Sequence, residues 1–480
     1  MAADRDVSLS GGTDHMELLK DWRLDDRVKS FLCNSRIYKY ISELDAVRVD
    51  TKLVSFLCNS YEDGHFHIGN HRLYLGLQDI FYLTGLPIDG KPVISNSQDI
   101  DGLCERLLGR IPPKKNVVKS GYVGLKWLKE EFEEVNVPAD SPDIHRYVRA
   151  YLLFVLGCVV FPGLPRHQVP GDYLHLFDDL SAIDDFAWGS AMLAHLHVAL
   201  KRVRDKNSKG KNLSASCFIL QIFALEHLPK LVTSYFGGDF ELPKAIPLAG
   251  GWSKLLARYS RNNNKKFNMA EADEISLTPY NRVLISDPNF LDQFKLCGGR
   301  FYSICLDRIW FYSYEDCADQ LGLPPVDNPL PKMDVGTLPK CRKGEQRDWE
   351  KYYEGYVAHW NDRQSTCVDL SLPAIVEDEM EFMPSPGIFT GVSPSSALVA
   401  DGADQPLQEH TTEMPSPVIE EGPSLPSSHI LPGGDSVLAV DQPPQKYQTK
   451  RRLRKWCRKK YYTFMVKPKR SRHPVLNLFL

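Results

Sequence analysis

The sequence predicts a mainly α protein with a small β-hairpin component, in which a large helical domain precedes a disordered C-terminal tail. Three helical patterns between residues 141 and 229 carry the first prediction, because apolar helices at this density share one core. Alternating apolar residues around Gly69-Asn70 predict the hairpin. A change of composition after Cys367 predicts the tail.

The N-terminal third begins with a polar stretch, residues 1–20, that we expect to be mobile. Apolar residues then recur from Asp25 to Leu57 and predict two or three short helices. In the hairpin, Phe66, Ile68, Leu73 and Leu75 alternate. A helix follows through Leu77, Ile80 and Phe81, and Gly85 and Pro87 end it.

Four helices are predicted in the middle of the chain. An amphipathic helix covers 121–135, and a second, begun by Ser141-Pro142-Asp143, runs to Phe161 and is apolar on all sides. Asp184 or Asp185 can cap a third helix over 186–202. Ser214 can cap a fourth, which ends at Pro229.

Residues 230–366 are less periodic, apart from aromatic clusters. Phe301 to Tyr314 is one cluster, and 348–360 predicts a helix with Trp349 and Trp360 close to one face. We therefore divide the chain into a flexible segment 1–20, a helical domain 21–366, a disordered acidic linker 367–445 and a basic aromatic tail 446–480.

Cysteine use and hydropathy indicate a reduced protein away from membranes. None of the eleven cysteines forms a C-x-x-C pair, and reduced thiols are the simplest interpretation. We expect no secretory signal, and the longest apolar run, Tyr151 to Phe161, is shorter than the roughly 18 to 20 residues of a membrane span. The net charge of −3 hides a segregation: residues 368–445 hold thirteen acids and no Lys or Arg, whereas 446–474 hold thirteen Lys or Arg and no acid.

Nucleotide and acyl-transfer templates do not fit the sequence. Gly85-x4-Gly90-Lys91 approaches a phosphate loop, but Pro92 stands where Ser or Thr would hold magnesium, and a predicted helix precedes it. No Gly-x-Ser-x-Gly elbow is present, and no local pattern marks a lysine for pyridoxal phosphate.

Two groups of side chains invite a metal interpretation. His65, His67 and His71 form a histidine cluster on the hairpin, but no cysteine or carboxylate nearby completes a tetrahedral set, and a hairpin with a wet polar face explains them. The pairs Asp178-Asp179 and Asp184-Asp185 could be nuclease-type acids, but they sit where helices end and begin, so capping explains them. We predict no catalytic residue, no metal ligand and no cofactor.

The basic tail carries the most informative chemistry. Runs of this density are typical of nuclear import sequences or nucleic-acid patches, and interleaved aromatic rings offer stacking surfaces to bases. On a helix the same segment would also suit an acidic partner groove or a membrane surface. The residues concerned are Lys450, Arg451, Arg452, Arg454, Lys455, Trp456, Arg458, Lys459, Lys460, Tyr461, Lys467, Lys469, Arg470 and Arg472.

The last five residues place leucines at alternate positions, Leu476, Leu478 and Leu480. This spacing resembles the Leu-x-Leu-x-Leu repression motif by which plant transcriptional regulators recruit corepressors, and an extended peptide would project all three to one side. Leu73, Leu75 and Leu77 fit the same pattern inside the predicted domain.

An ordered succession of motifs resembles the plant mobile domain family, also called the aminotransferase-like plant mobile domain or MAIN-like proteins. The resemblance spans about residues 25–365. It implies a plant protein of a domain shared by transposable elements and host genes, with host members associated with the nucleus, transposon silencing and meristem maintenance. It carries over no catalytic residue. The motifs are Phe66-His67, Leu77-Gln78-Asp79-Ile80, Gly85 to Val93, Arg149 to Leu153, Phe161-Pro162, Trp188-Gly189-Ser190-Ala191, Leu220-Gln221 to Glu226, Pro279-Tyr280 and Gln320 to Pro325.

These observations lead to one expected function and two alternatives. We expect a non-enzymatic nuclear protein whose mobile domain is an interaction module for other nuclear proteins. The first alternative is a transposon-derived protein that binds nucleic acid through the basic tail. The second is a cryptic enzyme that depends on a metal or on pyridoxal phosphate.

Overall fold

The computed structural model describes residues 7–96, 99–113, 121–163, 166–205, 212–237, 240–262, 267–268, 270, 272–283, 285, 288–324, 326 and 348–371. Within these ranges the protein is mainly helical with small β components, as predicted. The α-helices are α1 Thr13–Lys20, α2 Asp26–Leu32, α3 Arg36–Ser42, α4 Thr51–Ser60, α5 Leu77–Thr84, α6 Ile100–Leu108, α7 Leu125–Phe132, α8 Ile144–Val155, α9 Trp188–Arg204, α10 Cys217–His227, α11 Pro229–Phe236, α12 Leu248–Asn262, α13 Pro288–Phe294, α14 Trp349–Tyr352 and α15 Glu354–Asn361.

Short helical turns and small sheets join these helices. The turns are η2 Leu156–Val160, η3 Gly171–Phe177, η4 Leu180–Asp185, η6 Pro279–Arg282, η7 Lys295–Gly298, η8 Tyr314–Cys317 and η9 Arg363–Thr366. The strands are β1 Ser8–Ser10, β2 Tyr61–Glu62, β3 His65–Ile68, β4 His71–Tyr74, β5 Tyr122–Gly124, β6 Gln168–Pro170, β7 Asn212–Ser214, β8 Arg300–Cys305 and β9 Arg308–Ser313. Among the described residues they pair as β1-β7 in parallel, and as β2-β3-β4, β5-β6 and β8-β9 in antiparallel sheets.

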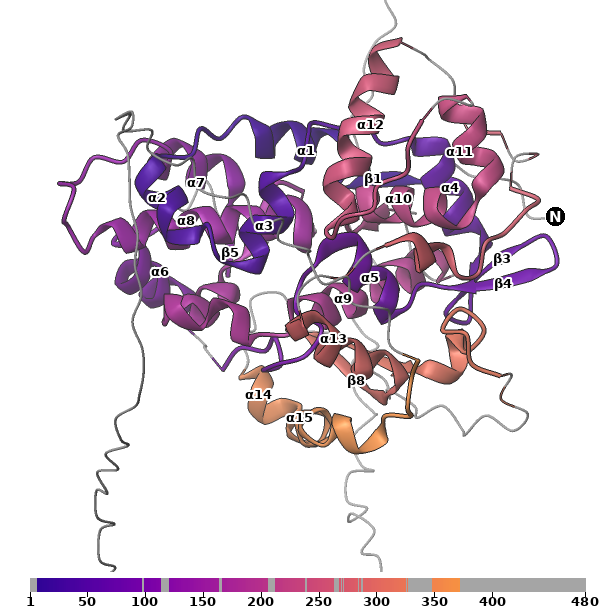
Figure 1. Ribbon diagram of the computed structural model, residues 1–480. Helices are drawn as coiled ribbons and strands as arrows, with labels where there is room; N and C mark the ends of the chain where they lie inside the picture. Colours follow the sequence, from indigo (N-terminus) through magenta and orange to yellow (C-terminus); the bar gives the residue numbers. More distant parts are fainter. Residues whose placement is uncertain are drawn as a thin grey trace, which may run out of the picture. The chain divides into compact units, whose positions relative to one another are not determined.

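Helix α9 is the element on which the core is built. It is buried from Trp188 to Leu200, including His195 and His197, so no face of these turns is wet. Such a helix packs on all sides. It contacts α5, the β8-β9 hairpin, α4, β2 and β7. In Figure 1 it lies between the group α1, α2, α3, α6, α7 and α8 and the group α4, α10, α11 and α12.

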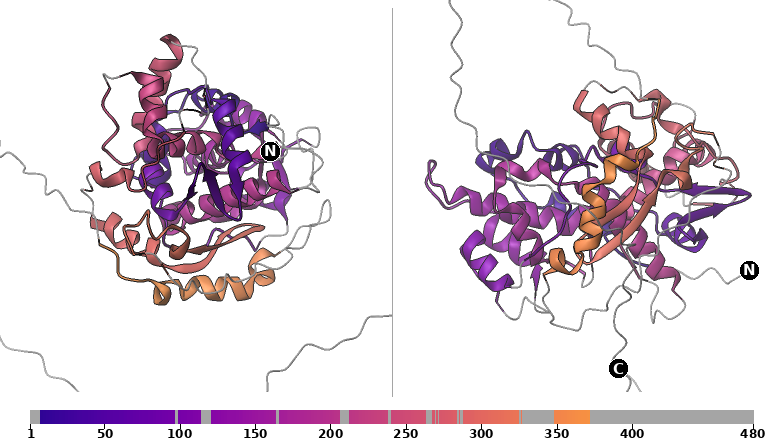
Figure 2. Two further views of the ribbon diagram at one scale, coloured as in Figure 1. Left: turned by 90° about the vertical axis from the view of Figure 1, so that its right-hand side faces the viewer. Right: turned by 90° about the horizontal axis from the view of Figure 1, so that it is seen from below.

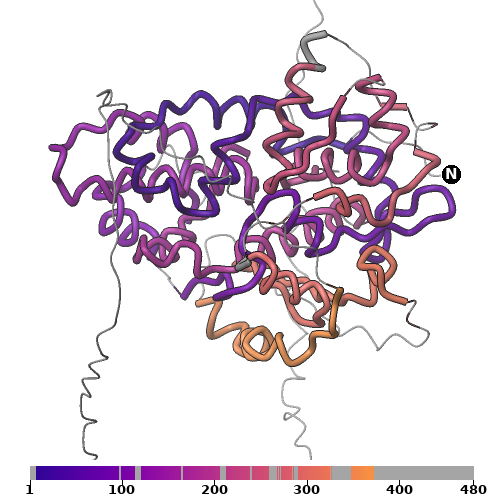
Figure 3. The backbone as a smooth tube through the Cα atoms, in the orientation of Figure 1, coloured from indigo at the N-terminus to yellow at the C-terminus, as the bar shows by residue number. Residues whose placement is uncertain are grey.

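The tube view shows how far the first sixty residues extend through this arrangement (Figure 3). α1 contacts η2 and α2 contacts α8, whereas α4 contacts α10 and α3 contacts α12. Trp22, between α1 and α2, places its ring 4.5 Å from the ring of Phe154. The N-terminal helices therefore belong to both helical groups.

The predicted hairpin and following helix are confirmed. β3 pairs with β4 in the register Phe66 to Leu73 and Ile68 to His71, and α5 begins three residues after β4. Gly85 ends α5 in the left-handed conformation at φ 62°, which glycine adopts without a Cβ clash. The segment after it extends along α9.

A close approach between two signature motifs holds that segment in place. Gly189 in the first turn of α9 donates its N–H to the carbonyl of Pro87 at 2.7 Å. A Cβ on Gly189 would lie 2.8 Å from Ile88, closer than real carbon contacts allow. Ser190 then donates its hydroxyl to the Ile88 carbonyl. The motif at 188–191 therefore packs closely against the segment 86–88 and hydrogen-bonds to its backbone.

The aromatic cluster at 301–314 is a β-hairpin that the sequence reasoning did not identify. Phe301 to Cys305 are all buried, and Ile309, Phe311 and Tyr312 on the partner strand are buried too. One side packs on α9 and α15 packs on β8, as the two views in Figure 2 show. Because both faces are covered, the apolar-polar alternation that marks a half-buried strand is missing.

Two predicted caps differ from those in the structure. Asp184 does not cap α9, whose N-cap residue is Ala187. Its carboxylate instead accepts the Arg36 N–H at 2.9 Å, which adds a cap to α3 beside that of its N-cap residue Ser35. The N-cap residue of α10 is Ser216, not Ser214. In both cases the predicted cap precedes the helix by too many residues.

Candidate functional site

Several signature motifs meet in a buried polar network centred on Asp79. This carboxylate lies in the first turn of α5 and is fully buried. Its Oδ2 accepts the Gly76 N–H at 2.7 Å, which caps the helix. Its Oδ1 accepts the Tyr280 hydroxyl at 2.7 Å and lies 3.0 Å from His227 Nε2. Residues 148 and 201 positions away therefore share one oxygen.

His227 completes the network at the end of α10. Its Nδ1 lies 2.7 Å from the carbonyl oxygen of Ser276, which can only accept, so Nδ1 carries a proton. Its Nε2 faces the Asp79 carboxylate at 3.0 Å. The imidazole is fully buried, and both of its nitrogens are hydrogen-bonded inside the protein.

A second buried acid stands beside it. Glu226 Oε1 accepts the indole N–H of Trp252 at 2.6 Å and the Arg282 guanidinium at 2.7 Å. The side chain of Glu226 is 1% exposed, so its charge needs this partner. The two networks join α5, α10, α12 and η6. Removing one partner of a buried pair typically costs about 3–5 kcal/mol, because the other charge stays buried.

A carboxylate, an imidazole and a phenol also occur together in acid–base sites. Here each of the three side chains is buried and hydrogen-bonded to other parts of the fold. Asp79 and His227 have no exposed side-chain surface, and Tyr280 is 5% exposed. Burial raises the pKa of the Tyr280 hydroxyl well above its usual range, and the nearby Asp79 and Glu226 charges act in the same direction. The arrangement stabilises the contact between helices.

Gln320 links another signature motif to the hairpin. Its side-chain amide accepts the Tyr74 N–H at 2.8 Å and donates to the Tyr74 carbonyl at 2.9 Å. Gln78 in α5 donates to the Gln320 carbonyl at 3.2 Å. The amide thus satisfies backbone groups at the outer edge of β4, which would otherwise be unpaired.

The segment after α5 contacts α15 and η9, the last helical elements that the structure describes. Arg363 donates from Nε to Asp89 Oδ1 at 2.6 Å, and its second nitrogen contacts the same oxygen. Trp360 donates its indole N–H to the Gly90 carbonyl at 3.0 Å, and the guanidinium stacks 4.4 Å from that indole ring. These contacts hold the segment 348–366 against the loop formed by the family motif Gly85 to Val93.

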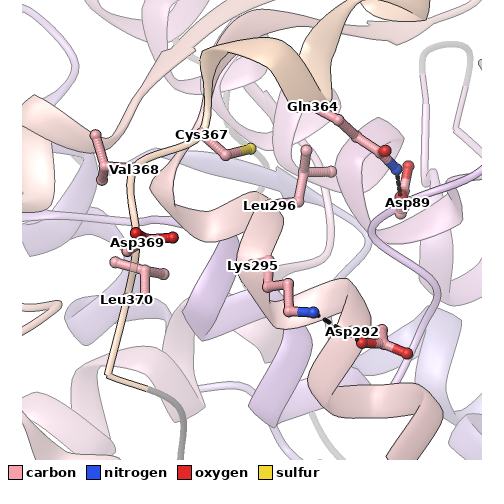
Figure 4. Close-up of a pocket in the computed structure, with 9 residues that line it drawn as sticks. All are labelled: Asp89, Asp292, Lys295, Leu296, Gln364, Cys367, Val368, Asp369 and Leu370. Atoms are coloured by element: carbon pink, nitrogen blue, oxygen red, sulfur yellow. Dashed lines mark hydrogen bonds and ion pairs between the residues drawn. The ribbon is translucent and has the colours of Figure 1, made fainter.

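A cavity of about 640 Å³ lies beside this contact (Figure 4). Lys295 pairs with Asp292 at 3.0 Å, and Asp89 accepts a hydrogen bond from Gln364 Nε2 at 3.0 Å. Burial raises the pKa of the Cys367 thiol, which disfavours the nucleophilic thiolate. The lining residues are Asp89, Asp292, Lys295, Leu296, Gln364, Cys367, Val368, Asp369 and Leu370.

One group among the described residues brings metal-ligand atoms together, and it is Asp14, His15 and His167. Asp14 Oδ2 lies 2.5 Å from His167 Nε2 and 3.2 Å from His15 Nδ1. Burial alone would raise the pKa of Asp14, but hydrogen bonds from His167 and Arg166 lower it to about 2. Burial lowers the pKa of His15 to about 4. At neutral pH the carboxylate is therefore charged and the buried imidazole is neutral.

A family match spans the motifs that meet around Asp79. Residues 49–384 match the family described as the plant mobile domain. The chain belongs to the plant mobile domain family. The Asp79 and Glu226 networks lie inside the matched range, whereas Asp14 and His15 precede it.

Curated relatives of this plant mobile domain come from Arabidopsis thaliana. "Protein MAINTENANCE OF MERISTEMS" is 29% identical over 278 residues, covering 55% of each chain. "Protein MAIN-LIKE 2" is 38% identical over 178 residues, covering 35% of this chain and 26% of the relative. "Serine/threonine-protein phosphatase 7 long form homolog" is 25% identical over 381 residues, covering 73% of this chain and 27% of the relative. The chain thus spans about half or less of the length of these relatives.

No solved structure matches the chain. Within the described residues of the mobile domain, every helix is too short or too polar to cross a bilayer. The segments predicted to act outside the domain, the basic tail Lys450 to Arg472 and the leucines 476, 478 and 480, lie outside the described residues.

The histidines of the hairpin do not come together as a metal site. His65 is buried, and its ring nitrogens face the carbonyl oxygens of Asp63 and Asp316, each at 3.1 Å. His67 in β3 and His71 in β4 are exposed to solvent. The wet-face explanation fits these two and not His65.

The acid pairs have structural partners in the mobile domain. Asp179 caps η4 through the Ser181 N–H at 2.9 Å, and Asp178 pairs with Arg106. Asp185 pairs with Lys91 at 2.9 Å. The predicted capping role therefore applies to Asp179, which caps η4. It also applies to Asp184, but the helix that Asp184 caps is α3 and not α9.

Proposed function

We propose that this chain is a non-enzymatic nuclear protein whose mobile domain is an interaction module in gene regulation, transposon silencing and meristem maintenance. The observation that carries the proposal is that polar side chains of the family motifs are buried and hydrogen-bonded within the protein. Asp79, Glu226 and Gln320 each bind partners within the fold and are nearly or fully buried. A module of this kind keeps its polar groups for its own architecture and meets its partners through its surface.

The printed name of the relative MAINTENANCE OF MERISTEMS supports the meristem role. The basic segment from Lys446 to Arg472 supports the nuclear one, because thirteen cations within 27 residues are typical of an import sequence. On both grounds we propose nuclear proteins as its partners.

Affinity purification from an extract of plant nuclei, with the purified chains added as bait, tests the interaction module independently of import. The full chain is compared with a variant that ends at residue 371, which keeps every described contact and removes linker and tail. We expect the same nuclear proteins to be recovered with both chains. Partners that bind the full chain and are lost from the shorter chain would assign the interaction to the tail and contradict the proposal.

A fluorescent fusion tests the localisation separately. We expect the full chain to concentrate in nuclei and a chain without residues 446–474 to distribute between nucleus and cytoplasm. A matched chain in which only the aromatic residues Trp456, Tyr461, Tyr462 and Phe464 are alanine keeps all cations and should still enter nuclei. Equal nuclear accumulation of the deleted chain would remove the import role from the tail.

The non-enzymatic part is tested with a chromogenic phosphate monoester, because one relative carries a phosphatase name. The purified full chain is assayed with magnesium, manganese and zinc ions. We expect no turnover above that of a heat-denatured sample. Turnover that persists in the full chain through further purification would refute this part of the proposal.

The second candidate, nucleic-acid binding by the tail, is favoured by the aromatic rings that alternate with its cations. It predicts affinity for single-stranded oligonucleotides that falls steeply with salt and weakens when Trp456 and Tyr461 are replaced by alanine. The aromatic variant therefore separates the two roles of the tail, because import needs its charges and base stacking needs its rings. Absence of binding at low salt would end this candidate.

A further inference from the structure

The cluster at Asp14 joins two parts of the chain that are 152 residues apart. Asp14 and His15 lie in the first turn of α1, and His167 lies in the loop before β6. One carboxylate oxygen, Asp14 Oδ2, is approached by His167 Nε2 at 2.5 Å, by Arg166 Nη2 at 2.7 Å and by His15 Nδ1 at 3.2 Å. His15 Nδ1 accepts the Gly11 N–H at 3.2 Å, so it has a lone pair and no proton to offer this oxygen, and two acceptor atoms lie side by side.

His15 is the unusual member of the cluster. Its side chain is 1% exposed, and its Nε2 is buried with no hydrogen-bond partner. Its Nδ1 lies 3.2 Å from Asp14 Oδ2 and 3.2 Å from the Gly11 N–H, which is a long contact. A buried histidine without strong partners is costly, and such a group needs an explanation.

His167 is held toward His15 by an uncommon backbone conformation. Its φ is +59°, a left-handed value that few residues other than glycine adopt. Its carbonyl accepts the Leu125 N–H at 2.9 Å, which fixes the loop, and its ring centre lies 4.8 Å from that of His15. Strained residues of this kind concentrate at functional sites.

We propose that Asp14, His15 and His167 form a binding site for a zinc ion. Two imidazole nitrogens and one carboxylate oxygen are a ligand set that zinc accepts, with water in the fourth position. The three ligand atoms already lie within 4.8 Å of one another. Zinc at the shared centre would replace the crowded contacts on Asp14 Oδ2 and the weak Gly11 contact on His15.

Arg166 distinguishes a zinc site from an ordinary ion cluster. Its guanidinium donates to Asp14 Oδ2 from Nε at 3.0 Å and from Nη2 at 2.7 Å, and its side chain is 53% exposed. In a zinc site this cation competes with the metal for the carboxylate and turns into solvent when zinc binds. In an ion cluster it is a stabilising partner. Replacing Arg166 should therefore raise the affinity of a zinc site, whereas in an ordinary ion cluster it would only remove a stabilising partner of Asp14.

The bound ion would fasten the N-terminal segment to the mobile domain. β1 and α1 precede the matched range 49–384, and β1 reaches the domain through its pairing with β7. α1 also contacts η2, and zinc would add a link from α1 to the loop before β6. Because metal binding to the folded state only is folding free energy, zinc should stabilise this segment.

The test is zinc binding by the purified full chain, measured by titration after removal of metal with a chelator. We expect one site that is lost in Asp14→Asn and in His167→Ala, with affinity reduced more than about tenfold. Both side chains are partly exposed, at 30% and 46%, so these variants should fold. His67→Ala, which removes an exposed histidine on the hairpin, is the matched control and should bind like the parent chain.

Two further readouts decide the outcome. Arg166→Ala should bind zinc more tightly than the parent, and cobalt in place of zinc should give a visible absorption spectrum that changes in His167→Ala. Zinc binding that is the same in the parent, Asp14→Asn and His167→Ala would overturn the proposal, as would weaker binding by Arg166→Ala. No binding at micromolar zinc would overturn it as well.

Discussion

Tyr280→Phe is the sharpest test of the network around Asp79. The substitution removes one hydroxyl and keeps the ring, which stacks on Tyr82 with centres 4.5 Å apart. The lost hydrogen bond is 2.7 Å long and ends on a buried carboxylate, and bonds to charged groups contribute about 1.5–3 kcal/mol. Asp79 keeps its contacts with Gly76 and His227, so we expect a loss at the lower end, about 1.5–2 kcal/mol.

Asp79→Asn should cost more. The amide must direct its NH₂ group either at the Gly76 N–H or at the two donors on the other oxygen, so donors face each other. Breaking a buried pair in this way typically costs about 3–5 kcal/mol. In that background Tyr280→Phe should cost less than about 1 kcal/mol, because the acceptor is no longer charged.

Urea denaturation of the full chains, followed by tryptophan fluorescence, measures the three variants and gives the coupling energy of a double-mutant cycle. We expect a coupling of about 1 kcal/mol between positions 79 and 280. Tyr38→Phe, at a half-buried tyrosine outside the network, is the control and should change stability by less than about 0.5 kcal/mol. Additive effects of Asp79→Asn and Tyr280→Phe would refute the shared hydrogen bond.

Three further changes test other parts of the structure. Arg363→Ala should lower the free energy of unfolding by about 2–3 kcal/mol, because Asp89 loses a partly buried partner; a thermal midpoint equal to that of the parent chain would contradict this. Gly90→Ala should cost at least about 2 kcal/mol, since φ is +132° and the new Cβ would meet the Asp185 carbonyl; unchanged urea midpoints would refute the close approach. Burial raises the pKa of Asp172 to about 7, so its ionisation destabilises the folded state above that pH, and the penalty disappears as pH falls from about 7 toward 4. Asp172→Asn should therefore stabilise the chain by about 1–2 kcal/mol at pH 8, with the gain shrinking toward pH 4, and a gain independent of pH would contradict the raised pKa.

Local patterns in the sequence predicted the local elements of the fold. The hairpin, the following helix and its end at Gly85 depend on residues that are close in sequence, and the structure has them as predicted. The hairpin at 300–313 was missed because both of its faces are buried, which removes the period of two. The cap that Asp184 supplies to α3 was missed because it crosses 148 residues.

The same limit explains why the sequence did not reveal the polar networks. Asp79 looks like an ordinary first-turn acid, and its bond to Gly76 is indeed a local cap. Nothing near Tyr280 or His227 indicates that both reach the same carboxylate. His15 and His167 were likewise overlooked, because their spacing matches no local metal motif. Only the fold brings such residues together.

The positions of these contacts explain what the family motifs preserve. Asp79 binds the motif at 279–280, Gln78 binds the motif at 320, and the residues 86–88 lie against the motif at 188–191. Each motif is thus one half of a contact between elements far apart in the chain. A set of motifs that records such contacts identifies a fold and does not by itself identify a partner.

The contact between Gly90 and Trp360 extends this argument to the end of the domain. Beyond η9, Val368 still donates its N–H to the Gly298 carbonyl at 3.0 Å, and Leu370 approaches Gly298 as well. A chain cut before residue 348 would uncover Phe301, whose ring lies 5.4 Å from that of Trp360, together with the unpaired Asp89. Partners recovered with such a fragment would report on exposed core, so a truncation that tests the mobile domain must end after residue 370.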